Sequence, residues 1–443
     1  MLAELPRQIE VRYSPGMVHV SGAVSQRVRI TMQSMLQGMF PSVSDRLLDL
    51  VEIAAGVYAI DRIYRRSPTK SNEAGARILP ICFYISEPLY WAQPTITNQV
   101  AELLHFLTGD LWLLSFAQGE RAPRARQSVI DFAWGRQAGH VALYSGGLDS
   151  AAGLANELLG GHRDFILLTA GHQASIRRRA MRQLSALKRL LPNAASLTHL
   201  AFVVNLQNPA RMRIQEMTQR SRGFLFCAAA AMVATCCGVP AVHVYENGHG
   251  AFNLPLGTGA LSGGFATKGA HPTFLRMMSD LVSETLSSSV NFVLPFADFT
   301  KAEMVAKLNE VPGLAAWLAS SCSCVHSSWR ERGIDHCGHC PACIERHQSF
   351  FSAGMQDQTP YSRQLWGRPD PLGNDYLRAY LDNALRWLEQ DLRVLRRFRQ
   401  HCGMSDIPSG DRNRLAQLCH RHAQEVVATY GNLHHSSATR DAA

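Results

Sequence analysis

A glycine turn between a short apolar strand and a helix constrains this fold more than any other feature of the sequence. Residues 141–144 are apolar, residues 145–150 read Ser-Gly-Gly-Leu-Asp-Ser, and an alanine- and leucine-rich stretch follows. Two glycines let the backbone turn tightly and bring its N–H groups close to an anion, while the helix N-terminus adds partial positive charge. This order predicts a phosphate-binding loop in an α/β fold.

The side chains of this loop suggest two different tasks. Ser145 and Ser150 can donate hydroxyl hydrogen bonds to phosphate. The Asp149 carboxylate would be repelled by phosphate, so we expect it to hold Mg²⁺. The Gly-Lys-Ser/Thr ending of a Walker A loop is missing, so the sequence predicts a phosphate site of another kind.

Apolar strands alternate with helices downstream of the loop. Strand patterns at 164–172, 197–205 and 239–248 alternate with helical patterns at 175–191 and 222–238. Such alternation predicts a parallel sheet covered by helices, with the active site beyond the carboxyl ends of the strands. We therefore expect these segments to meet in space: residues 145–150, 169–172, Asn205 and 246–250.

The remaining chain divides into regions of different pattern. Alternation around Ser14-Pro15-Gly16 predicts a β-hairpin, and leucines spaced over 377–395 predict a long amphipathic helix. The arginine-rich face of that helix is either solvated or a docking surface for a protein or nucleic acid. The expected regions are an N-terminal α+β domain (1–135), a phosphate-loop domain (136–360) with a zinc-binding segment (322–346), a C-terminal helical extension (361–430) and a disordered tail (431–443).

Composition excludes some classes of protein. A hydrophobic content of 46% with 18% charged residues predicts a folded core rather than intrinsic disorder. The longest apolar stretch, 47–60, contains two acidic residues and is too short to span a bilayer, and the N-terminal pattern is not secretory. We expect a cytoplasmic protein with no membrane partner. The net charge of +9 permits a polyanionic partner such as tRNA or an ATP-rich site, but a basic solvated surface is the favoured interpretation.

A cluster of cysteines indicates a metal centre. Five of the eleven cysteines lie within 322–343, and Cys337, Cys340 and Cys343 have the spacing C-x2-C-x2-C. Such gaps let thiolates converge on one tetrahedral Zn²⁺, for which Cys324 is the preferred fourth ligand. The other donors near by are Cys322, His336 and His339. A structural zinc is favoured over redox chemistry or an iron–sulfur cluster.

Residues 145–150 and the segment His-Cys-Gly-His-Cys-Pro-Ala-Cys-Ile-Glu-Arg-His at 336–347 together resemble the 7-cyano-7-deazaguanine synthase (QueC) family of PP-loop ATP pyrophosphatases. Residues 221–226 and 300–303 agree with that family in order and approximate spacing. The resemblance implies a HUP-type (adenine nucleotide alpha hydrolase-like) sheet. It also implies that ATP adenylates the carboxylate of 7-carboxy-7-deazaguanine, and that an amine then displaces AMP.

The resemblance also implies roles for single residues. Catalysis would fall to Asp149, Ser150, Arg222 and Lys301. ATP would contact Ser145, Gly146, Gly147, Leu148, Asp149, Ser150, Thr169 and His172. The deazaguanine would contact Glu246, Asn247, His249 and His271, and zinc would bind Cys324, Cys337, Cys340 and Cys343. The expected cofactors are ATP, Mg²⁺ and Zn²⁺.

Three departures from the family bear on the acceptor amine. The chain is about twice as long as an ordinary synthase, the gap from Cys324 to Cys337 is longer, and the loop at 246–256 differs. In these respects the chain resembles the QueC-like proteins of bacterial anti-phage operons (Qat and type IV CBASS), which implies coupling of a deazaguanine to an amine of a partner protein from the same operon. The alternatives are a free synthase in queuosine biosynthesis, a tRNA-modifying PP-loop enzyme, and a non-enzymatic scaffold.

Overall fold

The structure is a computed structural model of the 443-residue chain. It describes residues 7–40, 43–66, 76–120, 138–171, 174–191, 194, 196–206, 216, 218–254, 267–286, 289–325, 334–367, 371–389 and 409–438.

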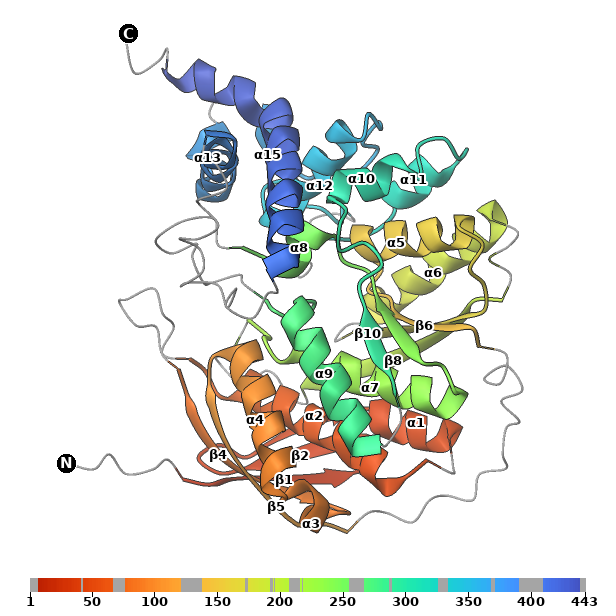
Figure 1. Ribbon diagram of the computed structural model, residues 1–443, viewed down its shortest axis with the longest axis vertical. Coiled ribbons are helices and arrows are strands. Elements are labelled where there is room, and N and C mark those ends of the chain that lie inside the picture. Colours follow the sequence, from red (N-terminus) through yellow and green to blue (C-terminus); the bar gives the residue numbers. More distant parts are fainter. Residues whose placement is uncertain are drawn as a thin grey trace, which may run out of the picture.

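One ten-stranded sheet runs through the molecule in the order β10-β9-β6-β7-β8-β3-β2-β1-β4-β5 (Figure 1). Its strands are β1 Ile9–Ser14, β2 Met17–Ser21, β3 Gln26–Ile30, β4 Ile78–Ile85, β5 Leu111–Gln118, β6 His140–Leu143, β7 Phe165–Gly171, β8 Thr198–Leu206, β9 Ala241–Val244 and β10 Asn291–Val293. The helices are α1 Met32–Met39, α2 Asp45–Ile63, α3 Pro88–Trp91, α4 Pro94–Thr108, α5 Leu148–Leu159, α6 Ala174–Leu190, α7 Arg222–Cys237, α8 Gly248–Phe252, α9 Pro272–Leu286, α10 Lys301–Ala306, α11 Leu314–Ala319, α12 Pro341–Ser352, α13 Asp375–Glu389 and α15 Ser409–Ala438. The predicted α/β class with a mostly parallel sheet is confirmed.

The parallel part of the sheet creates a reversal of strand order beside the phosphate loop. From β6 the chain adds β7 and then β8 on one side, and later adds β9 and β10 on the other, all parallel. Ligands of open parallel sheets bind where the order reverses, beyond the carboxyl ends of the strands. Here that point lies between β6, which leads into the phosphate loop, and β9, which leads into residues 245–247.

The N-terminal strands extend this sheet rather than forming a separate one. The predicted hairpin is present as β1 and β2, and β3 pairs with β8 in antiparallel orientation. The Ser44 hydroxyl caps α2 by accepting from the Leu47 amide at 3.3 Å. The division into domains near residue 135 stays a prediction, and it would cut a continuous sheet.

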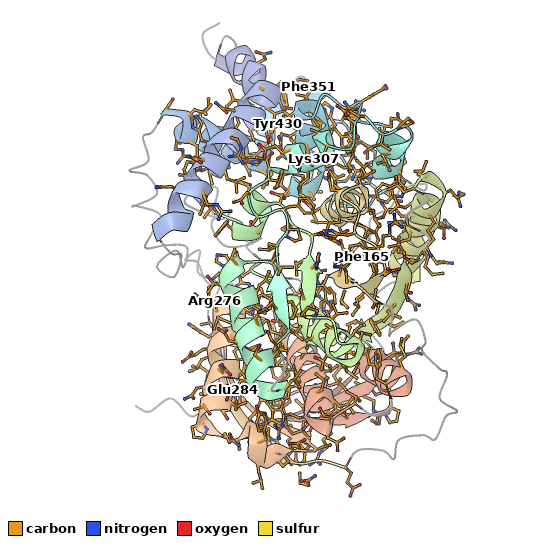
Figure 2. The ribbon with its side chains drawn as sticks, turned by 45° about the vertical axis from the view of Figure 1, so that its right-hand side comes forward. Phe165, Arg276, Glu284, Lys307, Phe351 and Tyr430 are labelled. Carbon is orange, nitrogen blue, oxygen red and sulfur yellow. The ribbon has the colours of Figure 1, made fainter. Side chains whose placement is uncertain are left out.

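The C-terminal helices pack against α8 and α12, above the carboxyl edge of the parallel strands (Figure 1). The expected amphipathic helix is present as α13, and its predicted continuation over 390–395 lies outside the described residues. Residues 431–438 were expected in a disordered tail; instead they continue α15. Figure 2 labels Phe351 on α12 and Tyr430 on α15, and the Tyr430 hydroxyl donates to the Ile344 carbonyl at 2.9 Å. No described helix is long and apolar enough to cross a membrane.

Candidate active site and metal centre

The phosphate loop has its glycines and hydroxyls where an anion site needs them. Gly146 has φ +76°, a conformation that favours glycine, and Gly147 is the N-cap of α5. The Ser145 and Ser150 hydroxyls lie 3.1 Å apart, and Ser145 Oγ accepts from the Gly147 amide at 3.2 Å. The Leu148 amide donates to Ser323 Oγ at 3.1 Å. A phosphate that binds here would therefore replace these hydroxyl contacts with hydrogen bonds to its own oxygens.

Three carboxyl groups lie around one lysine beside this loop. Lys301, the first residue of α10, places Nζ 3.1 Å from Asp149 Oδ2 and 3.3 Å from Glu345 Oε2. Burial opposes the charged form of Lys301, but the carboxylates of Asp149, Glu345 and Glu246 outweigh it and raise its pKa. Lys301 therefore stays cationic at neutral pH. Sequence patterns had not indicated Glu345 as part of this group.

The segment after β9 places two polar side chains beside the Asp149 carboxylate. The Asn247 amide donates to Asp149 Oδ1 at 2.9 Å and to Glu246 Oε1 at 2.8 Å. Its own carbonyl accepts from the Gly250 amide and so caps α8. Burial, together with the charge of Asp149, raises the pKa of Glu246 well above its ordinary value. Asn247 thus has an internal role, whereas Glu246 is a carboxyl that tends to stay protonated.

His249 is covered by a residue from the C-terminal helix. Its ring stacks on His422 of α15 with centroids 3.6 Å apart and an angle of 24° between the planes. Burial and the neighbouring His422 lower the pKa of His249 well below 6.5, and burial lowers that of His422 to about 4. Tyr376 of α13 donates to Glu345 at 2.5 Å. Sequence analysis missed His422 and Tyr376.

Other predicted residues lie apart from this group or outside the description. Thr169 is buried and donates to the Tyr144 carbonyl at 2.5 Å. Arg222 is exposed at the start of α7, over the ring of Phe226. His271 is buried between the rings of Phe106 and Phe252. His172 and the Asn205 side chain lie outside the described residues. The roles assigned to these residues stay predictions.

The four predicted cysteines converge on one point. The sulfurs of Cys324, Cys337, Cys340 and Cys343 all lie within 4.8 Å of one another. Cys324 Sγ is 3.9 Å from Cys340 Sγ, and Cys337 Sγ is 4.0 Å from Cys343 Sγ. Tetrahedral zinc with Zn–S bonds of about 2.3 Å requires sulfurs about 3.8 Å apart. The donor set and its spacing therefore fit a structural Zn²⁺, with Cys324 as the fourth ligand.

Cys322 has a different position from that of a zinc ligand. Its amide donates to the Gly146 carbonyl at 2.9 Å, and its sulfur accepts from Arg179 Nη1 at 3.1 Å. The buried Arg346 guanidinium donates to Ser321 Oγ at 2.8 Å and to the carbonyls of α11. The cysteine segment is thus tied directly to the phosphate loop, and Cys322 is not committed to metal.

Comparisons with known proteins agree with this geometry. Residues 268–354 match the family model "Queuosine biosynthesis protein QueC". The chain is 31% identical over 111 residues to the 7-cyano-7-deazaguanine synthase of Rhizobium johnstonii, covering 24% of this chain and 43% of the relative. It is 26% identical over 238 residues to that of Brucella ovis, covering 50% of this chain and 92% of the relative.

The chain thus spans less than half the length of the first relatives that it matches. The matched segment 268–354 nevertheless contains Lys301, Glu345 and all four clustered cysteines. On these matches the chain contains a segment that is similar to the QueC family.

Proposed function

We propose that this protein is an ATP-dependent enzyme that adenylates the carboxylate of 7-carboxy-7-deazaguanine and passes its acyl group to an amine. The Lys301–Asp149 pair, at 3.1 Å beside the phosphate loop, is the observation that carries this proposal. The relatives' name, 7-cyano-7-deazaguanine synthase, supports the choice of substrate.

In the first step a carboxylate oxygen attacks the α-phosphorus of ATP and pyrophosphate leaves. The loop N–H groups and the hydroxyls of Ser145 and Ser150 would bind the departing phosphates, and Lys301 would neutralise the charge that develops. Carboxylate oxygens suit Mg²⁺, and Asp149 would hold that ion. Both Asp149 oxygens already have partners, Lys301 and Asn247, so at least one of them must yield. When bound, the metal would supply further charge neutralisation.

We infer that the acceptor is an amine of a partner protein from an anti-phage operon in the cytoplasm. Support comes from the length of the chain that lies outside the matched segment, including α13 and α15. The plain synthase, which uses ammonia and ends at a nitrile, is the second candidate because the relatives bear that name. A sulfur-transferring tRNA enzyme would need a cysteine at the site, and only the position of Cys322 favours it.

One incubation separates these outcomes. The purified protein is mixed with ATP, 7-carboxy-7-deazaguanine and one acceptor: ammonium chloride, tRNA or the product of the neighbouring gene. 7-Deazaguanine without the carboxylate is the matched control substrate. Pyrophosphate release that requires the carboxylate supports adenylation, and release that ignores it would refute the proposal. Mass spectrometry of each acceptor then identifies which one gains the deazaguanine.

A further inference from the structure

The C-terminal helix α15 lies beyond the segment 268–354 that matches the family model. It nevertheless forms hydrogen bonds with α10, the helix that carries Lys301, and with the residues just before it. Arg421 Nε donates to Glu303 Oε1 at 2.7 Å, and Arg421 Nη2 donates to the Asp298 carbonyl at 2.6 Å. Thr300 Oγ1 donates to Glu425 Oε1 at 2.5 Å. Thr300 is the N-cap of α10, where it forms a capping box with Glu303. These contacts fix the start of α10 and hence Lys301.

The same face of α15 also holds the start of α8, at residues 248–249, in place. His422 lies between Arg421 and Glu425 on this helix and stacks on His249 at 3.6 Å. Gly248 packs so closely that a Cβ there would meet the Ala297 carbonyl oxygen at 1.9 Å and the Leu418 side chain at 2.6 Å. The start of α8, and with it His249, is thus held between the 297–299 turn and α15.

His422 itself is oriented from one side only. Its side chain is 9% exposed, and the Tyr380 hydroxyl lies 3.0 Å from Nε2. Its buried Nδ1 has no hydrogen-bond partner among the described residues, and Glu425 Oε2 lies 3.8 Å away. A buried polar atom without a partner is costly, so such atoms often mark functional sites. Burial keeps both imidazoles neutral at pH 7, and neutral rings can stack without charge repulsion.

We propose that α15 is part of the active centre and that His422 is a positioning residue, which orients His249 to take the proton of the acceptor amine. This inference rests on the proposed function. In that step the amine nitrogen forms a bond to the acyl carbon, the bond from that carbon to the AMP oxygen breaks, and AMP leaves with the electron pair. The amine proton goes to the neutral His249 imidazole. The products are an amide and AMP.

The test separates adenylation from transfer in the full-length protein. ATP–pyrophosphate exchange with 7-carboxy-7-deazaguanine reports adenylation, and single-turnover amide formation with ammonium chloride reports transfer. His422→Phe keeps the stacked ring, whereas His422→Gln keeps a partner for Tyr380 but loses the ring. His420→Ala is the matched control, because His420 is an exposed histidine on the same helix.

We expect His422→Gln to slow transfer by roughly 10²-fold, a typical effect of misplacing a reacting group. Exchange should change less than about two-fold, and His422→Phe should recover most of the transfer rate. A larger defect in His422→Phe than in His422→Gln, or an equal loss of exchange and transfer, would overturn the inference. Absence of exchange in the wild-type protein would instead refute the proposed function.

Discussion

Two buried charge clusters in this molecule differ in their balance of charge. In the N-terminal region Arg66 and Arg77 face Asp61, Asp110 and Glu216, whose side chains are at most 8% exposed, and Arg220 lies near the same three carboxylates. At the carboxyl edge of the parallel strands one lysine, Lys301, faces the carboxylates of Asp149 and Glu345, which are 18% and 30% exposed, with the carboxyl of Glu246 near by. The first cluster is paired and closed, and the second has an excess of negative charge and some access to solvent.

The pKa shifts follow this difference. Burial raises the pKa of Asp61, but Arg77, Arg66 and the Ser221 amide outweigh it, so the net shift is downward. For Glu246, burial and Asp149 outweigh Lys301, and its pKa is raised. Carboxyls whose pKa values are pushed apart are typical of functional sites, whereas paired networks mainly support the fold. The comparison therefore predicts that the first cluster serves stability and the second serves chemistry.

The cysteine centre should show the largest effect, because only a cation can balance four converging thiolates. Cys324→Ser should abolish binding of one zinc per chain and remove on the order of 10 kcal/mol from the local stability of its loop. Cys322→Ser should retain the zinc, because Cys322 lies outside the group. Elemental analysis and limited proteolysis of both variants give the result. Equal zinc loss in the two would contradict the assignment of the fourth ligand.

The excess negative charge of the second cluster should be essential for chemistry rather than for folding. Asp149→Asn should reduce pyrophosphate release on the order of 10³-fold, since it removes the carboxylate that faces Lys301. Its melting temperature should stay near that of the wild type. Asp375→Asn, at an exposed carboxylate of α13, is the control for loss of one charge. Unchanged turnover in Asp149→Asn would contradict the assignment of the second cluster to chemistry and the first to stability.

Local sequence patterns predicted the parts of the site that are contiguous. Residues 140–159 form a strand–turn–helix unit, and Cys337, Cys340 and Cys343 have a spacing that brings their sulfurs together. The alternation of strands and helices also predicted the sheet, because residues along one element determine its own period. Contiguity explains why these predictions match the structure.

Long-range partners could not be read from such patterns. Glu345 follows the last clustered cysteine by two residues. Only its 3.3 Å contact with Lys301 shows that it belongs to the candidate site. His422 lies on a helix whose periodicity shows a buried face without showing what covers it. Asn247 was predicted as a substrate contact, and in the structure its side chain caps α8 and donates a hydrogen bond to Asp149. Each case depends on packing between elements far apart in the chain.

The paired cluster should yield a stability effect without a catalytic one. Asp61→Asn should lower the free energy of unfolding by about 3 kcal/mol, because it leaves two buried guanidinium groups short of a carboxylate. Urea denaturation measures this, with Glu10→Gln as the control at an exposed ion pair expected to contribute less than about 1 kcal/mol. Turnover per folded molecule should not change. A large catalytic defect would mean that the N-terminal cluster also serves the site.

The smallest effect should be a difference in the sign of pH dependence between two buried carboxyls. Burial raises the pKa of Glu425 to about 7, despite hydrogen bonds from Thr300 and Gln348. Between pH 4.5 and 7 the unfolded chain has lost this proton while the folded one keeps it, so stability falls as pH rises, by about 1–3 kcal/mol. For Asp61 the folded pKa is lowered, so its contribution is lost as pH falls below about 4. Glu425→Gln should flatten the first slope in urea titrations and leave the acid limb unchanged. A slope that persists in Glu425→Gln would show that another carboxyl, such as Glu246, carries it.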